Sequence, residues 1–374
     1  MRSLVIALCA ALLLLPGCKK SDPNSVEDQV ERLQKAKNNK ERLAAIERLR
    51  SIGKKEAVPG LVEALKANPG EVREKIAVAL GDIKDTSATA ALSESIDFAV
   101  TSGSDKASQQ ANSANKEIAR ALGEIGDKAA TEALLKLLKV TKDQYVKIET
   151  INALGKLKDP RSVELLSEIA TDERIEPYIN KKAIMALSQI NDPRALPAYF
   201  KMAFAERKGV SFYPESSFAI FLLGDAANDK ILKVLAGEDK DLLAWAKERD
   251  ILEPAIYAKA AQIESDLQDR RAIPHLVKLL KFEDDNPRYK LIVRMNAADA
   301  LGRMRAKEGV GPISAMLTEE EANTRGAYMR SLVQIGEKSV VPSFIKCAAS
   351  GSWSARDYCV LGLAMLGEEK DLKA

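Results

Sequence analysis

The chain has 374 residues, of which 46% are hydrophobic and only 5% aromatic, and its formal net charge is +3. It contains one histidine, His275, which excludes a multi-histidine metal site and Ser-His-Asp or Cys-His catalysis. Basic and acidic residues are nearly balanced, at 57 and 54, so the charge argues against binding to DNA or RNA. We expect a protein that is not an enzyme and holds no cofactor and no metal.

The N-terminus reads as a targeting segment. Arg2 precedes an apolar run at residues 4–15, which is shorter than the roughly 20 residues that span a bilayer. The sequence Leu15-Pro16-Gly17-Cys18 that follows resembles the lipobox of bacterial lipoproteins. This resemblance implies a signal peptide at residues 1–17 and a lipid on Cys18. The alternative is an ordinary secretory signal in which the cysteine occurs by chance.

The residue after the cysteine bears on localisation. Lys19 stands there instead of aspartate, and by the enterobacterial sorting rule this resembles delivery to the outer membrane. We therefore expect a lipid-anchored protein of the bacterial cell envelope that faces the periplasm or the cell surface. Residues 18–40 would form the lipidated cysteine, a polar tether and an amphipathic helix over residues 26–36 that Ser25 begins. That helix would cap the repeat region, residues 41–374.

The repeat unit is clearest at residues 118–139. Ile118, Leu122 and Ile125 fall on one face of a helix, Gly126 is suited to end that helix in the left-handed conformation, and Asp127 to cap the next one. A second amphipathic helix follows. The spacing therefore predicts a helical hairpin around a Gly-Asp turn, which needs copies of itself on either side to bury its apolar faces.

The copies recur every 31 to 42 residues. The last core residue of the first helix, Ile125, has equivalents at Ile52, Ile83, Leu157, Ile190, Leu267, Met304, Ile335 and Leu366, and a degraded copy near Ala226. The residues before it are small at Ala79-Leu80-Gly81, Ala121-Leu122-Gly123, Ala153-Leu154-Gly155 and Ala300-Leu301-Gly302, so neighbouring first helices can approach closely.

This motif resembles the short bacterial HEAT repeat of the phycobilisome-lyase-like subtype. The resemblance implies an all-α fold: an armadillo-like α-solenoid, a right-handed superhelix of about ten helical hairpins. Members of such families usually bind other proteins, and a minority help attach bilin chromophores. Three segments interrupt the period: residues 101–115, which read as a flexible loop, residues 206–216 and residues 237–253. The last first helix, residues 353–366, would expose an edge through which the protein could form a homo-oligomer.

Two groups of residues are candidates for binding a partner protein. Seven aromatic residues cluster at residues 199–221, and we single out Tyr199, Phe200, Phe204, Phe212 and Tyr213. Phe204 is equivalent to Lys139, so we expect it to face solvent at an interface; the alternative is that the rings repack a disrupted core. Lys201, Lys278 and Lys346 occupy the second-helix position that we expect to line the concave surface. That surface is either a groove graded from acidic to basic or a solvated face.

The sequence leaves the state of two cysteines open. Cys347 and Cys359 fall at core-facing positions of adjacent helices, so either a disulfide or two buried thiols would fit. Taken together, the sequence predicts a membrane-anchored, non-enzymatic scaffold that binds proteins of unknown identity. The alternatives are an accessory lyase or chromophore-handling protein and a self-associating structural protein of the envelope.

Overall fold

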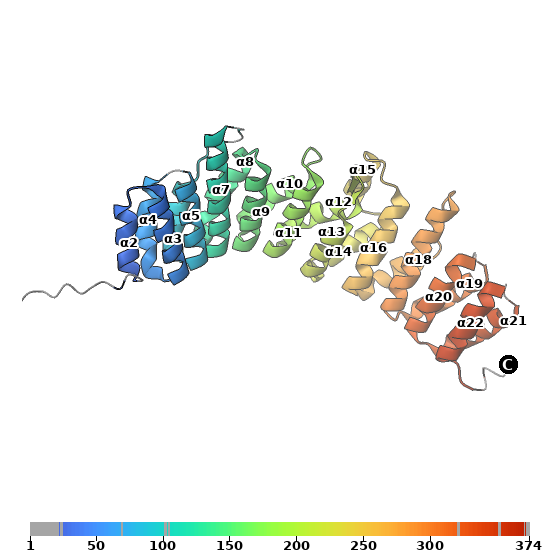
Figure 1. Ribbon diagram of the computed structural model, residues 1–374. Helices are drawn as coiled ribbons and strands as arrows, with labels where there is room; N and C mark the ends of the chain where they lie inside the picture. The colour runs from blue at the N-terminus through green and yellow to red at the C-terminus, as the bar shows by residue number, and fades with distance from the viewer. Residues whose placement is uncertain are drawn as a thin grey trace, which may run out of the picture. The chain divides into compact units, whose positions relative to one another are not determined.

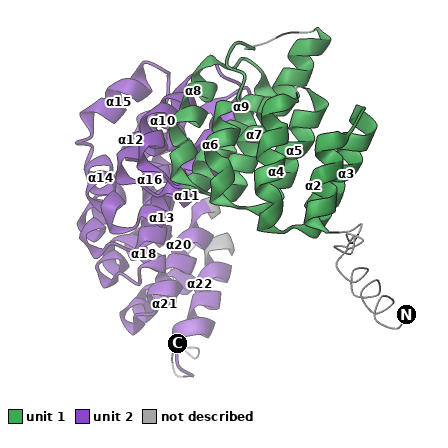
Figure 2. Cartoon of the chain, turned by 90° about the vertical axis from the view of Figure 1, so that its left-hand side faces the viewer, with its two compact units in different colours: residues 1–157 green, residues 158–374 purple. Residues whose placement is uncertain are grey.

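The computed structural model describes residues 22, 25–68, 70–100, 103, 105–319, 322–350, 353–369 and 371. The predicted signal peptide and the predicted lipidation site, Cys18, lie outside the described residues. The chain forms two compact units, unit 1 (Met1–Leu157) and unit 2 (Lys158–Ala374), which Figure 2 distinguishes by colour. Among the described residues, no helix combines the length and the apolar character needed to cross a membrane.

Unit 1 is built from helices alone in its described part. Its α-helices are α2 (Val26–Lys35), α3 (Asn39–Ile52), α4 (Val58–Ala67), α5 (Glu71–Ile83), α6 (Thr89–Glu94), α7 (Lys106–Ile125), α8 (Thr131–Val140) and α9 (Gln144–Leu157). The helix predicted over residues 26–36 is present as α2, and the Ser25 hydroxyl caps it by accepting a hydrogen bond from the Asp28 amide (3.1 Å).

Unit 2 is also helical, apart from one short hairpin of strands. Its elements are α10 (Val163–Thr171), α11 (Pro177–Ile190), α12 (Leu196–Phe204), β1 (Glu206–Arg207), β2 (Val210–Ser211), α13 (Tyr213–Leu223), α14 (Asp225–Ala236), α15 (Lys240–Lys247), α16 (Glu253–Leu267), α17 (Ile273–Leu279), α18 (Pro287–Arg303), α19 (Val310–Glu319), α20 (Ala322–Ile335), α21 (Val341–Ser350) and α22 (Trp353–Leu366). Strands β1 and β2 are antiparallel, with Glu206 opposite Ser211.

The described helices pair into ten hairpins, four in unit 1 and six in unit 2 (Figure 1). The predicted all-α solenoid of about ten helical hairpins is therefore confirmed. The predicted phase of the hairpins is wrong, however. Helix α8 packs against α9, whereas α7 and α8, on either side of the Gly-Asp turn, touch only weakly. Helix α2 is accordingly the first helix of the first hairpin, and α22 completes the last one.

Each unit has two rows of helices with different spacing. We call α3, α5, α7 and α9 in unit 1, and α11, α13, α16, α18, α20 and α22 in unit 2, the inner row. The outer row is formed by α2, α4, α6 and α8 in unit 1 and by α10, α12, α14, α17, α19 and α21 in unit 2. In each unit, neighbouring inner-row helices pack more closely than neighbouring outer-row helices. The inner row is therefore the shorter of the two rows and forms the concave side of its unit.

The Ala-Leu-Gly triplets explain the close spacing. A Cβ atom added to Gly123 would lie 2.8 Å from the Cα of Ala153, and one added to Gly81 would lie 2.8 Å from the Cα of Ala121. Any larger side chain would push the neighbouring helix away. The residue directly after the inner helix is left-handed in seven repeats, and after α18 the left-handed residue comes one position later. These residues are Gly53, Lys84, Gly126, Lys158, Asn191, Gln268 and Gly336, with Arg305 after α18.

The same turns place the caps that the sequence predicts. Asp127 accepts a hydrogen bond from the Ala129 amide (3.0 Å), and short 3-10 helices then lead into the outer helices. These 3-10 helices are Lys55–Ala57, Thr86–Ala88, Lys128–Ala130, Pro160–Ser162, Pro193–Ala195, Arg270–Ala272, Lys307–Gly309 and Lys338–Val340.

One predicted interruption of the period differs from the prediction. The loop expected at residues 101–115 is helical from Lys106 onward, because Asp105 caps α7 through the Ser108 amide (3.0 Å) and starts that helix early. The insertion at residues 206–216 contains the β1–β2 hairpin and the start of α13. The insertion at residues 237–253 contains the additional helix α15.

Candidate protein-binding surface

The predicted aromatic cluster lies mostly in the core. Tyr199, Phe200 and Phe212 are fully buried, and Phe204, which the sequence predicts to face solvent, is only 4% exposed. The expected exposure of Phe204 is wrong because the additional helix α15 covers α12 at the position that other repeats leave open. The rings therefore repack a core that the insertions disrupt.

Tyr213, at the start of α13, is partly buried. The Lys259 ammonium lies 5.7 Å from the centre of its ring, and burial raises the pKa of Tyr213 to about 12. At neutral pH the phenol is therefore neutral. Its ring packs against a cation from α16 and offers only part of its surface to a partner.

Hydrogen bonds fasten the β1–β2 hairpin to the connection that follows α10 and to α11. The Arg207 guanidinium donates to the carbonyl oxygen of Ile175 (3.1 Å) and to the side-chain oxygen of Asn180. Asn180, which is fully buried, donates to the carbonyl oxygen of Ile169 (2.6 Å). Because these carbonyl groups would otherwise lack partners at the end of a helix, the hairpin is a fixed part of unit 2.

The exposed apolar residues occupy other positions. Of the twelve large hydrophobic residues that are exposed among those described, eleven belong to inner-row helices and ten of these to unit 2. The eleven are Tyr145, Tyr178, Met185, Phe218, Phe221, Leu222, Ile292, Tyr358, Val360, Leu361 and Met365. The outer-row helices contribute none in the described part of the chain. The sequence predicted an exposed aromatic residue on the outer row, at Phe204, whereas the exposed apolar residues lie on the inner row.

A hollow of about 820 Å³ opens beside two of these residues. Phe218 and Phe221 of α13 line it together with Ser265 of α16 and Arg303 of α18. It forms because α13 and α16 are packed less closely than α16 and α18. The degraded repeat thus leaves space on the concave side of unit 2.

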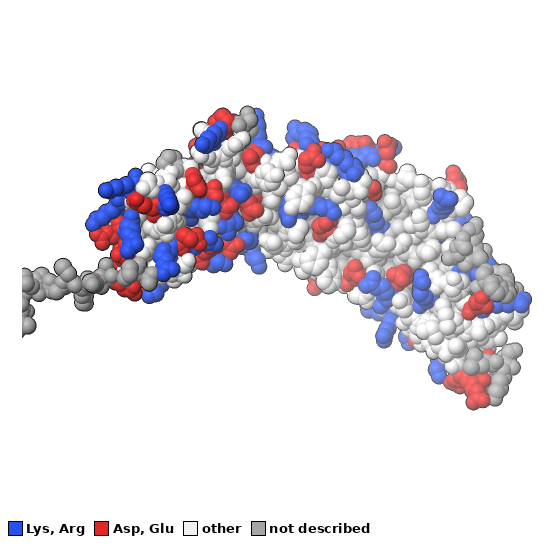
Figure 3. Space-filling view, in the orientation of Figure 1, with Lys and Arg blue, Asp and Glu red and all other residues white. Residues whose placement is uncertain are grey.

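The inner row of unit 1 is different, because its charged residues pair across neighbouring helices. The Glu124 carboxylate accepts hydrogen bonds from Lys156 (2.6 Å) and Lys84 (2.7 Å), which lower its pKa to about 2. Arg50 pairs in the same way with Asp82 (2.5 Å). Figure 3 shows basic and acidic side chains interspersed over unit 1 and larger uncharged areas over unit 2.

The predicted cationic positions lie on the outer row. Lys201 is on α12, Lys278 on α17 and Lys346 on α21, so the expectation that they line the concave side is wrong. The outer helices are more widely spaced, and Lys201 borders a groove of about 460 Å³ between α10 and α12. The three lysines do not meet in one site.

One buried acid has no counterpart in the other repeats. Glu264 of α16 occupies the leucine position of the Ala-Leu-Gly triplet and is fully buried. One of its oxygen atoms accepts a hydrogen bond from the Asp269 amide (2.8 Å), and the other has no partner among the described residues. Burial raises the pKa of Glu264 to about 8, so the side chain is mostly protonated at neutral pH.

A smaller cleft of about 350 Å³ brings acidic and basic groups together beside Trp245. Its Arg249 lies over the Trp245 ring (4.8 Å) and pairs with Glu173 (2.6 Å) and Glu248 (3.3 Å). Arg249 therefore pairs with two of the four acidic residues that line the cleft, and the lining keeps an excess of negative charge. No group of three or more potential metal ligands occurs in the part of the chain that the structure describes.

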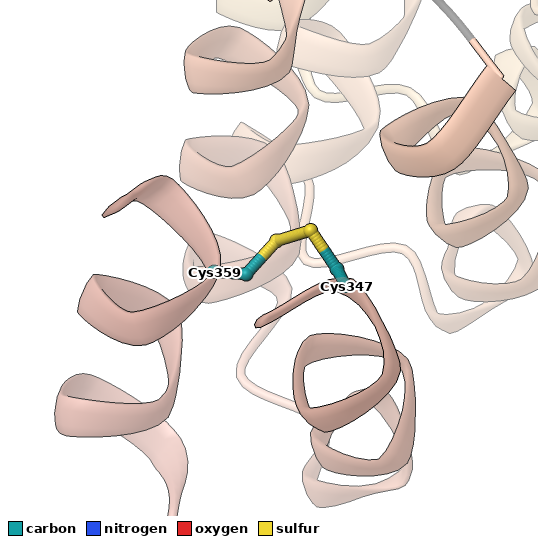
Figure 4. Close-up of a disulfide and its surroundings, with 2 residues drawn as sticks. All are labelled: Cys347 and Cys359. Carbon is teal, nitrogen blue, oxygen red and sulfur yellow. A yellow bond between two sulfur atoms is a disulfide. The ribbon is translucent and has the colours of Figure 1, made fainter. Parts of the chain in front are cut away.

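In the structure a disulfide joins Cys347 of α21 to Cys359 of α22 (Figure 4). Both cysteines are buried, and their Cα atoms are 5.9 Å apart. The bond links α21 to α22, so it holds together the last hairpin of unit 2.

Comparison with known proteins identifies the repeats. The family of HEAT repeats matches residues 26–100 and 106–176. No curated protein matches the chain. These two segments therefore contain HEAT repeats, and the chain folds as an α-solenoid.

Three solved structures align with this chain. The first is Kap95p, from a structure in which Kap95p binding induces the switch loops of RanGDP to adopt the GTP-bound conformation. It aligns with a TM-score of 0.51 and 11% sequence identity, over 91% of this chain and 50% of the Kap95p chain. Importin beta aligns with a TM-score of 0.47 and 14% sequence identity, over 96% of this chain and 53% of the importin beta chain. Human deoxyhypusine hydroxylase aligns with a TM-score of 0.28 and 18% sequence identity, over 83% of this chain and 95% of the hydroxylase chain. At 11% identity, the alignment with Kap95p indicates a similar fold alone.

Proposed function

We propose that the protein is a non-enzymatic scaffold that binds another protein through the inner row of unit 2, while a lipid on Cys18 holds it at the bacterial cell envelope. One observation carries the proposal: the exposed apolar residues concentrate on that row. Contiguous apolar surface is costly in water and usually marks a place where a partner binds. Aromatic residues are over-represented among those that contribute most to binding.

The binding part of the proposal is tested with a variant of the hollow. The double variant Phe218→Ser, Phe221→Ser removes two exposed rings, 58% and 49% exposed, and leaves the core intact. We expect this variant, purified from membranes, to capture less of the partner that the wild-type protein captures, with unchanged helical content. The matched control is Leu252→Ser, which removes an exposed apolar residue that lies outside the inner row. Equal capture by the double variant would refute the proposal.

The anchoring part rests on the resemblance of residues 15–18 to a lipobox. Two or more acyl chains bind a membrane stably, whereas a single chain binds only marginally, so a triacylated Cys18 would keep the protein in the membrane. We expect a palmitate analogue to label the wild-type protein, and expect Cys18→Ala to be unlabelled and released. Protease treatment of intact cells then distinguishes the periplasmic side of the outer membrane from the cell surface. An unlabelled mature wild-type protein would refute the anchor.

The accessory lyase or chromophore-handling role remains an alternative that the sequence leaves open. It requires a cleft with available acids and bases, and both arginines that line the cleft beside Trp245, Arg207 and Arg249, already have partners. The structure therefore offers this alternative little support. Self-association as a structural envelope protein is the other alternative. Its edge would be α22, whose Leu361 and Met365 are exposed, and sedimentation of the purified protein as a monomer would remove it.

A further inference from the structure

The hollow on the inner row of unit 2 has two chemically different sides. Phe218 and Phe221 of α13 form an apolar side. Arg303, at the end of α18, and Arg305, two residues later, form a basic side, beside the neutral amide of Gln334 from α20. An occupant that matches both sides needs apolar and acidic groups next to each other.

The two arginines differ in what they already contact. Arg303 donates to the Ser265 hydroxyl (2.9 Å) and to the Asp266 carboxylate (2.6 Å), so it is held in place and neutralises the only acidic residue that lines the hollow. Arg305 is exposed and has no acidic partner among the described residues. The hollow therefore keeps one uncompensated positive charge.

The position of Arg305 is fixed by the backbone. It lies two residues past the end of α18 in a left-handed conformation, with a φ of 50°, and its amide donates to the carbonyl oxygen of Gly302 (3.0 Å). In two inner-row turns of unit 1 and one of unit 2 this position is glycine, which carries no side chain. Here the turn instead places a guanidinium group at the border of an apolar surface.

The size of the hollow limits what it can accept. A volume of about 820 Å³ is in the range of small-ligand sites and accommodates a few side chains but not a folded domain. One uncompensated cation is far too few for nucleic acid, which requires many phosphate contacts. The complementary partner is a short protein segment in which carboxylates lie next to apolar side chains.

We propose that this hollow binds an acidic segment of the partner protein, whose apolar side chains pack on Phe218 and Phe221 while a carboxylate pairs with Arg305. This inference rests on the proposed function, because it specifies the chemistry of the segment that the inner row of unit 2 binds. Arg303, oriented by Ser265 and Asp266, lies ready to share the same carboxylate or to bind a second one. Arginine is suited to this role because its planar group can donate two parallel hydrogen bonds to one carboxylate.

The test uses a displayed library of random 12-residue peptides and the full-length protein in detergent. We expect the selected peptides to contain Asp or Glu next to Phe, Leu or Trp. A synthetic peptide from this set should bind, and its version with amides in place of the carboxylates should bind on the order of tenfold more weakly. Arg305→Glu should weaken binding by at least as much, whereas Arg305→Lys should retain part of it. The control, Lys278→Glu, reverses an exposed charge on the outer row and should bind normally.

The possible results separate this inference from the proposed function. The inference of an acidic segment would be overturned by any of three results: selection of neutral or basic peptides, no selection at all, or equal binding by Arg305→Glu. If partner capture still depends on Phe218 and Phe221 in that case, the proposed function stands. If the Phe218→Ser, Phe221→Ser variant still binds the peptides and still captures the partner as the wild type does, both this inference and the proposed function are overturned.

Discussion

Glu264 makes the stability of unit 2 depend on pH. In wild-type protein the carboxyl group is buried at a position where the other repeats have a leucine, and its pKa is raised from 4.5 to about 8. The substitution Glu264→Gln keeps an oxygen atom that can accept the hydrogen bond from the Asp269 amide, and it removes the titration. Any difference in pH dependence between the two proteins therefore reports the buried carboxyl group.

The sign and the size of the effect follow from proton binding. Between pH 4.5 and about 8 the folded protein keeps the proton on Glu264, whereas the unfolded chain has released it. The free energy of unfolding of the wild type should therefore fall, relative to the variant, by about 1.4 kcal/mol per pH unit. Over the whole window the loss approaches about 5 kcal/mol, as an order of magnitude. Below pH 4.5 the contribution of this group no longer changes, and above about 8 the loss is complete.

Urea unfolding at several pH values between 5 and 8.5, followed by circular dichroism, measures this difference. Hydrogen exchange of α16 provides a local measurement, because a repeat array can unfold in parts. Glu264→Leu should be more stable than wild type at pH 8 and nearly independent of pH in this window, although it leaves the Asp269 amide without its acceptor. Glu164→Gln, which changes an exposed glutamate on α10, is the control. Parallel pH profiles for wild type and Glu264→Gln would refute the reasoning.

Three further predictions concern the core, the disulfide and the charge pairs. Phe204→Ala should lower the free energy of unfolding by about 3–5 kcal/mol, because the ring is buried, and a change near zero in urea unfolding would contradict this. Cys347→Ser, Cys359→Ser should destabilise the last hairpin by about 3 kcal/mol in hydrogen exchange; two alkylated thiols in non-reduced wild-type protein would disprove the bond. Glu124, whose pKa is lowered to about 2, stabilises unit 1 above pH 4.5 and loses this contribution as the pH falls toward 2. Glu124→Gln should therefore be less stable by about 1 kcal/mol at pH 6 and match wild type near pH 2, a convergence that thermal unfolding would detect.

Local signals in the sequence predict the local structure of this chain well. The glycine at position 126 and the aspartate at position 127 specify a left-handed end and a cap, and the structure contains both. The small residues of the Ala-Leu-Gly triplets predict close packing, and Gly123 lies against Ala153. Each of these conclusions depends on one residue and its immediate neighbours, which is the range over which sequence determines conformation directly.

The phase of the hairpins is not determined in this local way. An inner helix followed by an outer helix has the same sequence period as an outer helix followed by an inner one. The turn after Ile125 is the more conspicuous signal, but α8 packs on α9 across residues 141–143. Which of two neighbours a helix packs against depends on the angle at which the chain leaves each turn. The same difficulty explains why the concave side was predicted on the outer row.

The misplaced aromatic site has a different cause. The position of Phe204 in its repeat is exposed in regular units, and the prediction assumed a regular unit. The additional helix α15 comes from a segment more than 30 residues later in the chain and covers α12. Phe218 and Phe221 belong to the same aromatic cluster, and their spacing of three residues on one helix was the signal that could have found the exposed face.

The degraded repeat is a reasonable place for a binding site in this fold. A regular inner helix has little freedom, because it must carry a small residue where the next helix approaches, as Gly302 does against Ser331 (2.8 Å from an added Cβ to the Cα). Its exposed side chains can also be occupied by ion pairs with the neighbouring helices. Glu124, for example, pairs with Lys84 and Lys156. Helix α13 departs from both requirements: it packs loosely on α16 and exposes Phe218 and Phe221. The same loose packing that departs from the regular stack at this point opens the hollow, so the irregular repeat and the proposed binding surface have one origin.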